Sequence, residues 1–122
     1  MSSLHAIGYA SCLVFGLTVG SAASARERSG AEIYHDICSS CHQHGAFDAP
    51  KLDDFSAWQP RLAKGKKGLY QSAVNGVGDN MPARDQYESR LSDREVKNAV
   101  NYMLKQTRQY RTDTRLLASG CQ

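Results

Sequence analysis

The feature of the sequence that most constrains the fold is the pentapeptide Cys38-Ser39-Ser40-Cys41-His42. Two cysteines, two spacers and a following histidine form the attachment pattern for c-type haem. In a helix, Cys38, Cys41 and His42 stand at i, i+3 and i+4, which places their side chains on one face. Two thiols there can join the two vinyl groups of one porphyrin while the imidazole reaches its iron. The motif therefore predicts one covalently attached haem c, with His42 as an axial ligand.

Two other uses of a CxxC motif are open at this point, because such pairs also ligate zinc and catalyse thiol–disulfide exchange. Zinc is disfavoured because adjacent Cys41 and His42 are poor partners on one tetrahedral ion, and the chain has no second CxxC. Exchange is disfavoured because the βαβ pattern around a redox CxxC is absent. His35 and His44 flank the motif, and neither is expected to be a metal ligand. We expect His35 to be a surface or packing residue, and His44 follows His42 too closely to reach the opposite side of a planar cofactor.

The N-terminal segment has the composition of a targeting sequence. Residues 1–25 contain no Lys, Arg, Asp or Glu, and residues 4–19 are mostly apolar or small. Ala23–Ala25 fits a small-residue cleavage site, which predicts a secretory signal peptide removed before Arg26. An uncleaved membrane anchor is the alternative, although the run is short and rich in Gly, Ser and Ala for a span. Export together with haem attachment predicts an oxidising compartment such as the bacterial periplasm.

The mature chain would keep 97 of the 122 residues, all of the charged side chains and a net charge of +3. A domain of this size buries a modest core on its own, and a porphyrin would supply much of the missing apolar centre. Of its three cysteines, Cys121 is left over after haem attachment. We expect a monomer with a frayed free thiol at Cys121, and a Cys121-linked dimer is the alternative.

Capping signals place the first and last helices. Ser29 and Glu32 form a capping box, so a helix is expected to begin near Gly30 and to run into the CxxCH motif. Ser92 and Glu95 form a second box at the start of the last helix. That helix has one continuous apolar stripe, which must pack against a neighbour such as the first helix: Val96, Ala99, Val100, Met103 and Leu104.

Two shorter helices are expected between these. One covers residues 56–62, where Pro60 is tolerated only within the first turn. The other covers residues 68–75 and ends at Gly76. Residues 45–52 are expected to form a loop. No strand pattern of any length is present, so the sequence predicts an all-α fold.

Met81 is the second candidate iron ligand. Gly76 and Gly78 precede it in a loop and allow the backbone to approach a flat ligand closely. Pro82 follows it and excludes Met81 from a helix. Its thioether is a soft ligand suited to ferrous iron, which predicts Met81 as the second axial ligand. Met103, in contrast, belongs to a helical stripe and is expected in the core.

Trp58 and a basic cluster complete the candidate features. Trp58 is expected to fill the core, to pack on a cofactor edge or to donate its N–H to a buried acid such as a haem propionate. The basic cluster has no acid among its members and forms either a solvated face or a surface that steers an acidic partner. It consists of Arg61, Lys64, Lys66 and Lys67. No phosphate-binding or nucleic-acid motif is present, so no nucleic-acid partner is expected.

Residues 34–104 resemble the class I c-type cytochromes, and most closely the short bacterial cytochrome c-five group. The matching motifs are Tyr34-x-x-x-Cys38-x-x-Cys41-His42, Ala49-Pro50-Lys51-Leu52, Trp58-x-Pro60-Arg61, Asn75-Gly76, Met81-Pro82 and Ala99-Val100-x-Tyr102-Met103. The resemblance implies a small all-α cytochrome c fold of three to five helices around one haem. It implies His42 and Met81 as axial ligands and the Pro50 carbonyl as the acceptor that orients His42. Trp58 and Arg61 are expected in the haem environment.

The composition of the chain and the resemblance together predict an organisation and a function. Residues 1–25 are expected to be a signal peptide, residues 26–110 a cytochrome c domain and residues 111–122 a polar, frayed tail. With both axial positions filled, the protein is expected to be a soluble periplasmic monohaem electron carrier and not an enzyme. A haem enzyme or gas sensor with a labile Met81 ligand is the alternative. Members of the group often have a second cysteine pair after the Met-Pro loop, and residues 83–90 contain none.

The expected partners are redox proteins with acidic docking patches. Basic groups occur at residues 61–67 and 105–115, and the net charge is +3. An electron carrier docks transiently through a small interface. Contact with a membrane is expected only through membrane-bound redox partners.

Overall fold

The computed structural model describes residues 26–87 and 90–120, so the predicted leader and Cys121 lie outside the described residues. The described chain is helical, and its only strand-like pairing is an isolated bridge between Val77 and Met81. In order, its elements are α1 (Gly30–Ile33), η1 (Tyr34–Cys38), α2 (Ser39–His42), η2 (Ala46–Asp48), α3 (Phe55–Leu62), α4 (Gly65–Asn75), η3 (Arg84–Gln86) and α5 (Asp93–Ser119). The prediction of an all-α fold is confirmed.

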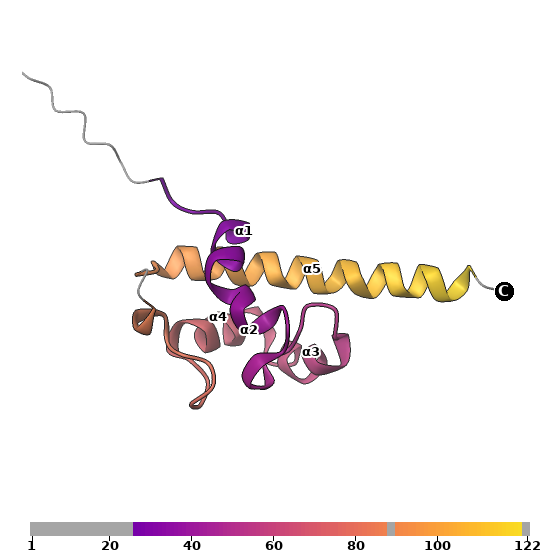
Figure 1. The fold of residues 1–122 in the computed structure, drawn as a ribbon, viewed down its shortest axis with the longest axis horizontal. Coiled ribbons are helices and arrows are strands. Elements are labelled where there is room, and N and C mark those ends of the chain that lie inside the picture. The colour runs from indigo at the N-terminus through magenta and orange to yellow at the C-terminus, as the bar shows by residue number, and fades with distance from the viewer. Residues whose placement is uncertain (1–25, 88–89, 121–122) are drawn as a thin grey trace, which may run out of the picture.

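The helices are arranged around α5, as Figure 1 shows. The N-terminal helical segment crosses α5 near its start, and α3 and α4 pack along one side of it. None of the helices within residues 26–87 and 90–120 combines the length and hydrophobicity needed to cross a membrane.

The N-terminal helical segment begins where its capping box predicts. The Glu32 amide donates to Ser29 Oγ at 3.3 Å, and the Ser29 amide donates to Glu32 Oε2 at 2.7 Å. The segment then contains a π-helical turn, η1, in which the Ser39 amide donates to the carbonyl of Tyr34. A π turn inserts an extra residue into the helix and is frequent at functional sites. The sequence predicts an uninterrupted helix here, so the π turn just before the CxxCH motif is a difference from that expectation.

The crossing between α1 and α5 depends on Gly30. A Cβ atom built there would lie 2.0 Å from the carbonyl oxygen of Asn98, so only glycine allows this approach of the two backbones. One turn further along, the rings of Tyr34 and Tyr102 pack with centroids 5.3 Å apart. The expected packing of the first helix against the last is therefore confirmed.

Replacement of Gly30 by alanine is expected to destabilise the holoprotein by about 2 kcal/mol or more, because the new methyl group meets backbone that cannot rotate away. Denaturant unfolding followed by circular dichroism measures this loss. Gly120→Ala is the matched control, since a Cβ there would lie 3.5 Å from its nearest neighbour and the backbone φ is −82°. Equal stability of the two variants would show that the helix crossing adjusts without cost.

Helix α3 begins one residue earlier than predicted. Asp54 is its N-cap, and its carboxylate accepts a hydrogen bond from the Ala57 amide at 3.1 Å. The start at Phe55 places Pro60 in the second turn, so the prediction that Pro60 lies in the first turn is wrong. Pro60 cannot donate to the Ser56 carbonyl, but both residues are exposed and water can satisfy that oxygen. Helix α4 ends before Gly76 as predicted and begins at Gly65, three residues before the predicted start.

Helix α5 continues without interruption to Ser119. The prediction of a frayed tail over residues 111–122 is therefore wrong for the described part of that segment. Residues 93–119 contain no glycine or proline that would end a helix. The Thr112 hydroxyl donates to the Arg108 carbonyl and the Thr114 hydroxyl donates to the Tyr110 carbonyl, so these polar side chains bond within the helix. The last turns of α5 project past the other helices (Figure 1).

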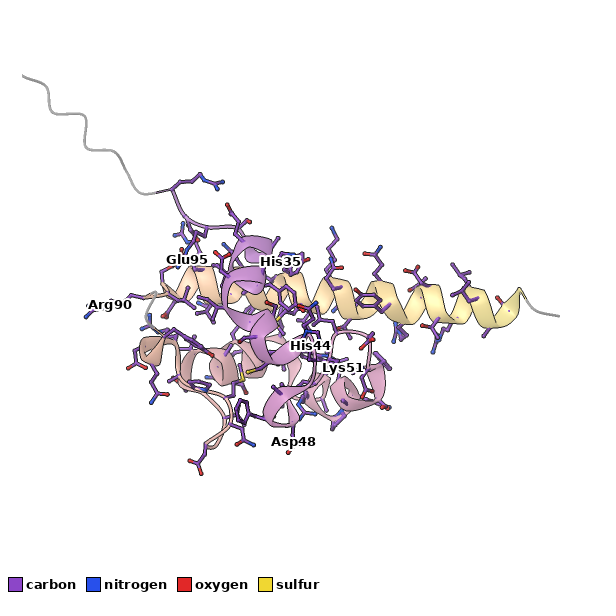
Figure 2. The ribbon with its side chains drawn as sticks, in the orientation of Figure 1. His35, His44, Asp48, Lys51, Arg90 and Glu95 are labelled. Carbon is purple, nitrogen blue, oxygen red and sulfur yellow. The ribbon has the colours of Figure 1, made fainter. Side chains whose placement is uncertain are left out.

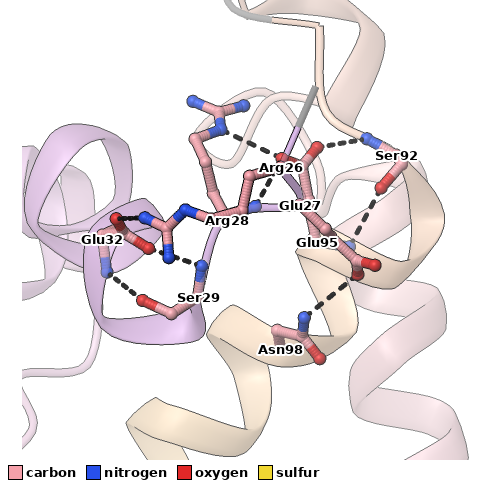
Figure 3. Close-up of polar contacts among 8 residues, drawn as sticks. All are labelled: Arg26, Glu27, Arg28, Ser29, Glu32, Ser92, Glu95 and Asn98. Atoms are coloured by element: carbon pink, nitrogen blue, oxygen red, sulfur yellow. Dashed lines mark hydrogen bonds and ion pairs between the residues drawn. The ribbon is translucent and has the colours of Figure 1, made fainter. Parts of the chain in front are cut away.

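A polar cluster fastens the start of the described chain to the start of α5 (Figure 3). The Arg28 side chain forms an ion pair with Glu95 at 3.0 Å, and the Asn98 amide donates to Glu27 at 3.2 Å. The second carboxylate oxygen of Glu95 accepts from the Ser92 amide at 2.9 Å, which completes the predicted capping box. Hydrogen bonds from Ser92 and Arg28 lower the pKa of Glu95 to about 2.

The low pKa of Glu95 predicts an acid-sensitive contribution to stability. Because the carboxyl has a lower pKa in the folded chain than in the unfolded chain, its contribution is present above about pH 4.5 and is lost as pH falls toward 2. We expect Glu95→Gln to cost about 1 kcal/mol at neutral pH and to flatten the decline below pH 4.5. Urea unfolding across this pH range measures both effects. The exposed Asp113 supplies the control, Asp113→Asn, and an unchanged pH profile in Glu95→Gln would contradict the prediction.

Candidate functional site

One cavity brings together every site residue predicted from the sequence. It has a volume of about 430 Å³, and its walls are mostly apolar. The predicted residues that line it are Cys38, Cys41, His42, Pro50, Trp58, Arg61 and Met81. They come from the CxxCH helix, the loop after it, α3 and the glycine-rich loop after α4. The structure therefore gathers into one cavity residues that are up to 43 positions apart, from Cys38 to Met81.

His42 lies in the cavity wall with its imidazole fixed by one hydrogen bond. The residue is 8% exposed, and its Nδ1 lies 2.9 Å from the Pro50 carbonyl oxygen. A carbonyl only accepts, so Nδ1 carries the proton and Nε2 keeps a lone pair for a metal. Burial lowers the pKa of His42, although the bond to Pro50 opposes this. The imidazole also stacks on the Trp58 indole, with ring centroids 6.1 Å apart and planes inclined by 28°.

The two cysteines lie on the same helical segment as His42 and line the same cavity. Burial raises the pKa of the Cys38 thiol to about 11. Thiol–disulfide exchange needs a thiolate, and cysteines that perform it have a lowered pKa. The pKa of Cys38 is shifted in the opposite direction, which disfavours the exchange function that the motif left open.

Met81 is held by the backbone of its loop. The Val77 amide donates to the Met81 carbonyl at 2.9 Å, and the Met81 amide donates to the Val77 carbonyl at 3.2 Å. Gly76 closes this turn with φ of +80°, and a Cβ there would lie 2.6 Å from the Met81 carbonyl oxygen. Met81 lies outside the helices, as the following Pro82 predicts. Its side chain is half-buried and lines the cavity. The glycine signal could be read from the sequence, whereas the reciprocal backbone pair could not.

Trp58 packs in the core and lines the cavity. It is 6% exposed and belongs to the buried cluster that includes Leu69 and Met103. Its indole N–H donates to the Lys51 carbonyl at 2.8 Å, so the alternative in which it donates to a buried acid is wrong. Arg61 lines the cavity as expected, and one guanidinium nitrogen donates to the Ala57 carbonyl at 2.6 Å.

Some cavity residues were not predicted from the sequence. Tyr87 lines the cavity, and burial raises its pKa. Lys64 also lines it, beside Arg61. Tyr87 lies in a segment without helical periodicity, so no pattern placed it near the CxxCH motif. Lys64 belongs to the predicted basic cluster, but its position relative to the cavity depends on where α4 begins.

The donor set and the walls fit a haem c. An imidazole nitrogen and a thioether sulfur are the axial donors typical of cytochromes c, and two thiols on one helix can form the thioether bonds. The apolar walls come from several elements and include Ile33, Leu69, Val96 and Ala99. Within residues 26–87 and 90–120, no three His, Cys, Asp or Glu side chains gather in the arrangement that a zinc site requires.

The two flanking histidines lie outside this cavity lining. His35 is on η1 and His44 follows α2, and both are exposed (Figure 2). The His35 ring packs edge-on against Tyr34, with centroids 5.2 Å apart. The expected placement of His35 as a surface or packing residue agrees with this position.

Comparisons with known proteins point to the same cofactor. Residues 25–103 match the family model described as "Cytochrome C oxidase, cbb3-type, subunit III". The chain is 35% identical to cytochrome c-555 of Chlorobaculum tepidum over 95 residues, which cover 75% of this chain and 87% of the relative. It is 36% identical to cytochrome c5 of Azotobacter vinelandii over 62% of this chain and 92% of the relative. A solved electron-transfer complex of nitrite reductase with cytochrome c is similar with a TM-score of 0.57 and 35% identity, covering 64% of this chain and 93% of that one.

An all-helical fold around a cavity with two thiols, an imidazole and a thioether defines a c-type cytochrome. The chain belongs to this family, with a covalently bound haem c, and serves in electron transport. Within the family it is similar to the small class I cytochromes named c5 and c-555.

Proposed function

We propose that the protein is a soluble periplasmic monohaem carrier of single electrons and not an enzyme. The observation that supports this is that His42 and Met81, which are 39 residues apart, line one apolar cavity with both cysteines. If both are axial ligands, the iron has six ligands and no open position for a substrate. Cys38 and Cys41 would hold the group covalently.

The residues of this chain would then keep the haem site rigid and exclude water from it. The bound haem iron supplies reversible one-electron oxidation and reduction. The Pro50 carbonyl fixes the orientation of the His42 imidazole, so that its Nε2 lone pair would be free to bind the iron. The backbone pair between Val77 and Met81 positions the thioether. The apolar walls exclude water, which together with the thioether favours the reduced state and raises the reduction potential.

We also propose the compartment and the kind of partner. A leader over residues 1–25 would export the chain to the periplasm, leaving a cytochrome domain that begins at residue 26. The solved structure that is similar to this chain is a complex of nitrite reductase with cytochrome c. This supports the proposal that the present chain also forms short-lived complexes with redox proteins. The net charge of +3 favours partners with acidic patches.

Purification from the periplasm, with the haem-ligation apparatus present, tests the proposed function. The mass is expected to equal residues 26–122 plus one haem, and the pyridine haemochrome spectrum should show one haem c per chain. A redox titration should fit a one-electron step, and the reduced protein should not bind carbon monoxide. A colourless protein, or ready binding of carbon monoxide, would contradict the carrier function.

A further inference from the structure

A second hollow lies outside the haem cavity, between the start of α4 and the middle of α5. It has a volume of about 260 Å³. It is lined by Lys66, Asn101, Leu104, Lys105 and Arg108. We call it the basic groove. Lys66 comes from the cluster at residues 61–67 and the other two cations come from the basic stretch of α5. The two basic stretches of the sequence therefore meet at one place in the fold.

The polar side-chain groups that the basic groove offers to a ligand are hydrogen-bond donors. Lys66, Lys105 and Arg108 are exposed, and none of them forms an ion pair within the described residues. The Tyr70 hydroxyl donates to Asn101 Oδ1 at 2.7 Å, so the amide oxygen is engaged and the Asn101 NH₂ group remains as a donor. A hollow with three cations, an amide donor and no acidic lining residue fits carboxylate groups.

The basic groove lies close to the haem cavity. Lys64 lines the cavity and Lys66, two residues later in the chain, lines the groove. On the α5 side, Leu104 lines the groove and packs in the buried cluster with Trp58 and Met103, which line the cavity. The buried cluster that contains Leu104 therefore connects the groove to the wall of the cavity.

The positive charge also continues beyond the groove. Arg115 lies seven residues after Arg108, two turns further along the same face of α5. This part of α5 projects past the other helices (Figure 1). An extended surface can contact both the groove and the projecting turns, whereas a single small anion can occupy only the groove.

We propose that the basic groove, with the α5 face through Arg115, is the docking site for an acidic surface of the redox partner protein. This rests on the proposed electron-carrier function. Carboxylates of the partner would lie between Lys66 and the two cations of α5, Lys105 and Arg108. Exposed ion pairs form and separate quickly, and their strength falls with salt, as transient docking requires.

A glutamate hexapeptide added to the holoprotein tests this docking site. We expect NMR shifts at Lys66, Asn101, Lys105 and Arg108, and an affinity that falls steeply with salt. Lys66→Glu and Arg108→Glu are each expected to weaken binding about tenfold, because each reversal turns an attraction into a repulsion. Lys67→Glu is the matched control, since Lys67 is the exposed neighbour of Lys66 with the same charge and does not line the groove.

Three outcomes would contradict the docking site. Equal weakening by Lys67→Glu would mean that only net charge matters. Inorganic phosphate that binds as tightly as the peptide and displaces it would indicate a small-anion site. Binding to phosphatidylglycerol vesicles but not to the peptide would indicate a membrane surface. The absorption spectrum and midpoint potential should be the same in all variants, so each of these failures leaves the carrier function standing, whereas an absent haem would remove the function itself.

Discussion

A chain in which Cys38 and Cys41 are both replaced by alanine, prepared without haem, is expected to lose most of its helical structure. The cavity of about 430 Å³ then holds no covalently attached haem. An unfilled cavity of this size would cost on the order of 10 kcal/mol. That cost is comparable with the whole stability of a small domain, about 5 to 15 kcal/mol. Far-UV circular dichroism and urea unfolding should show low helicity and no cooperative transition.

The control for this loss lies within the same motif. Ser39→Ala removes a hydroxyl that donates to the His35 carbonyl and does not line the cavity, so the haem-loaded protein should remain folded. Added haemin is expected to restore part of the helicity of the double variant, because His42 and Met81 can still bind iron without the thioether bonds. A haem-free chain that unfolds cooperatively with full helicity would show that the fold does not depend on a filled cavity.

Met81→Ala is expected to open one coordination position of the iron while leaving the haem attached. The oxidised protein should lose the methionine-to-iron charge-transfer band, and the reduced protein should bind carbon monoxide. Loss of the thioether removes a ligand that favours ferrous iron, so the midpoint potential should fall by on the order of a few hundred millivolts. Visible spectroscopy and a redox titration measure these changes.

Met103→Leu provides the comparison, since it replaces a methionine that also lines the cavity but lies on the apolar stripe of α5. A swap that conserves volume in the core costs less than about 1.5 kcal/mol. The charge-transfer band should therefore remain. If the unmodified protein lacks the band and binds carbon monoxide, Met81 is not a stable ligand and the haem enzyme or gas sensor is the better description.

The features that the sequence predicts well are those determined by local chemistry. The capping boxes at Ser29 and Ser92 depend on side chains three residues apart, and both form as predicted. Gly76 ends α4 because its positive φ suits glycine. Pro82 keeps Met81 out of a helix, and this local signal distinguishes the candidate loop ligand from Met103.

The features that the sequence did not predict depend on contacts between distant segments or on where a helix begins and ends. The π turn at Tyr34–Cys38 alters the register of the CxxCH helix, and no residue pattern signals it. Trp58 donates to the Lys51 carbonyl, a main-chain group whose position follows from the path of the loop. The continuation of α5 to Ser119 differs from the frayed tail that polar composition predicts, because a polar helix without glycine or proline can persist.

The length of α5 gives the molecule an uneven distribution of charge. At about 1.5 Å per residue, its 27 residues extend roughly 40 Å. The part of α5 after Leu104 has four basic residues against a single acidic residue, Asp113: Lys105, Arg108, Arg111 and Arg115. Positive charge placed far from the centre of mass creates a permanent dipole moment, and the field of an acidic protein exerts a torque on it. The cytochrome would therefore be turned toward a partner during diffusion, before any side chains touch.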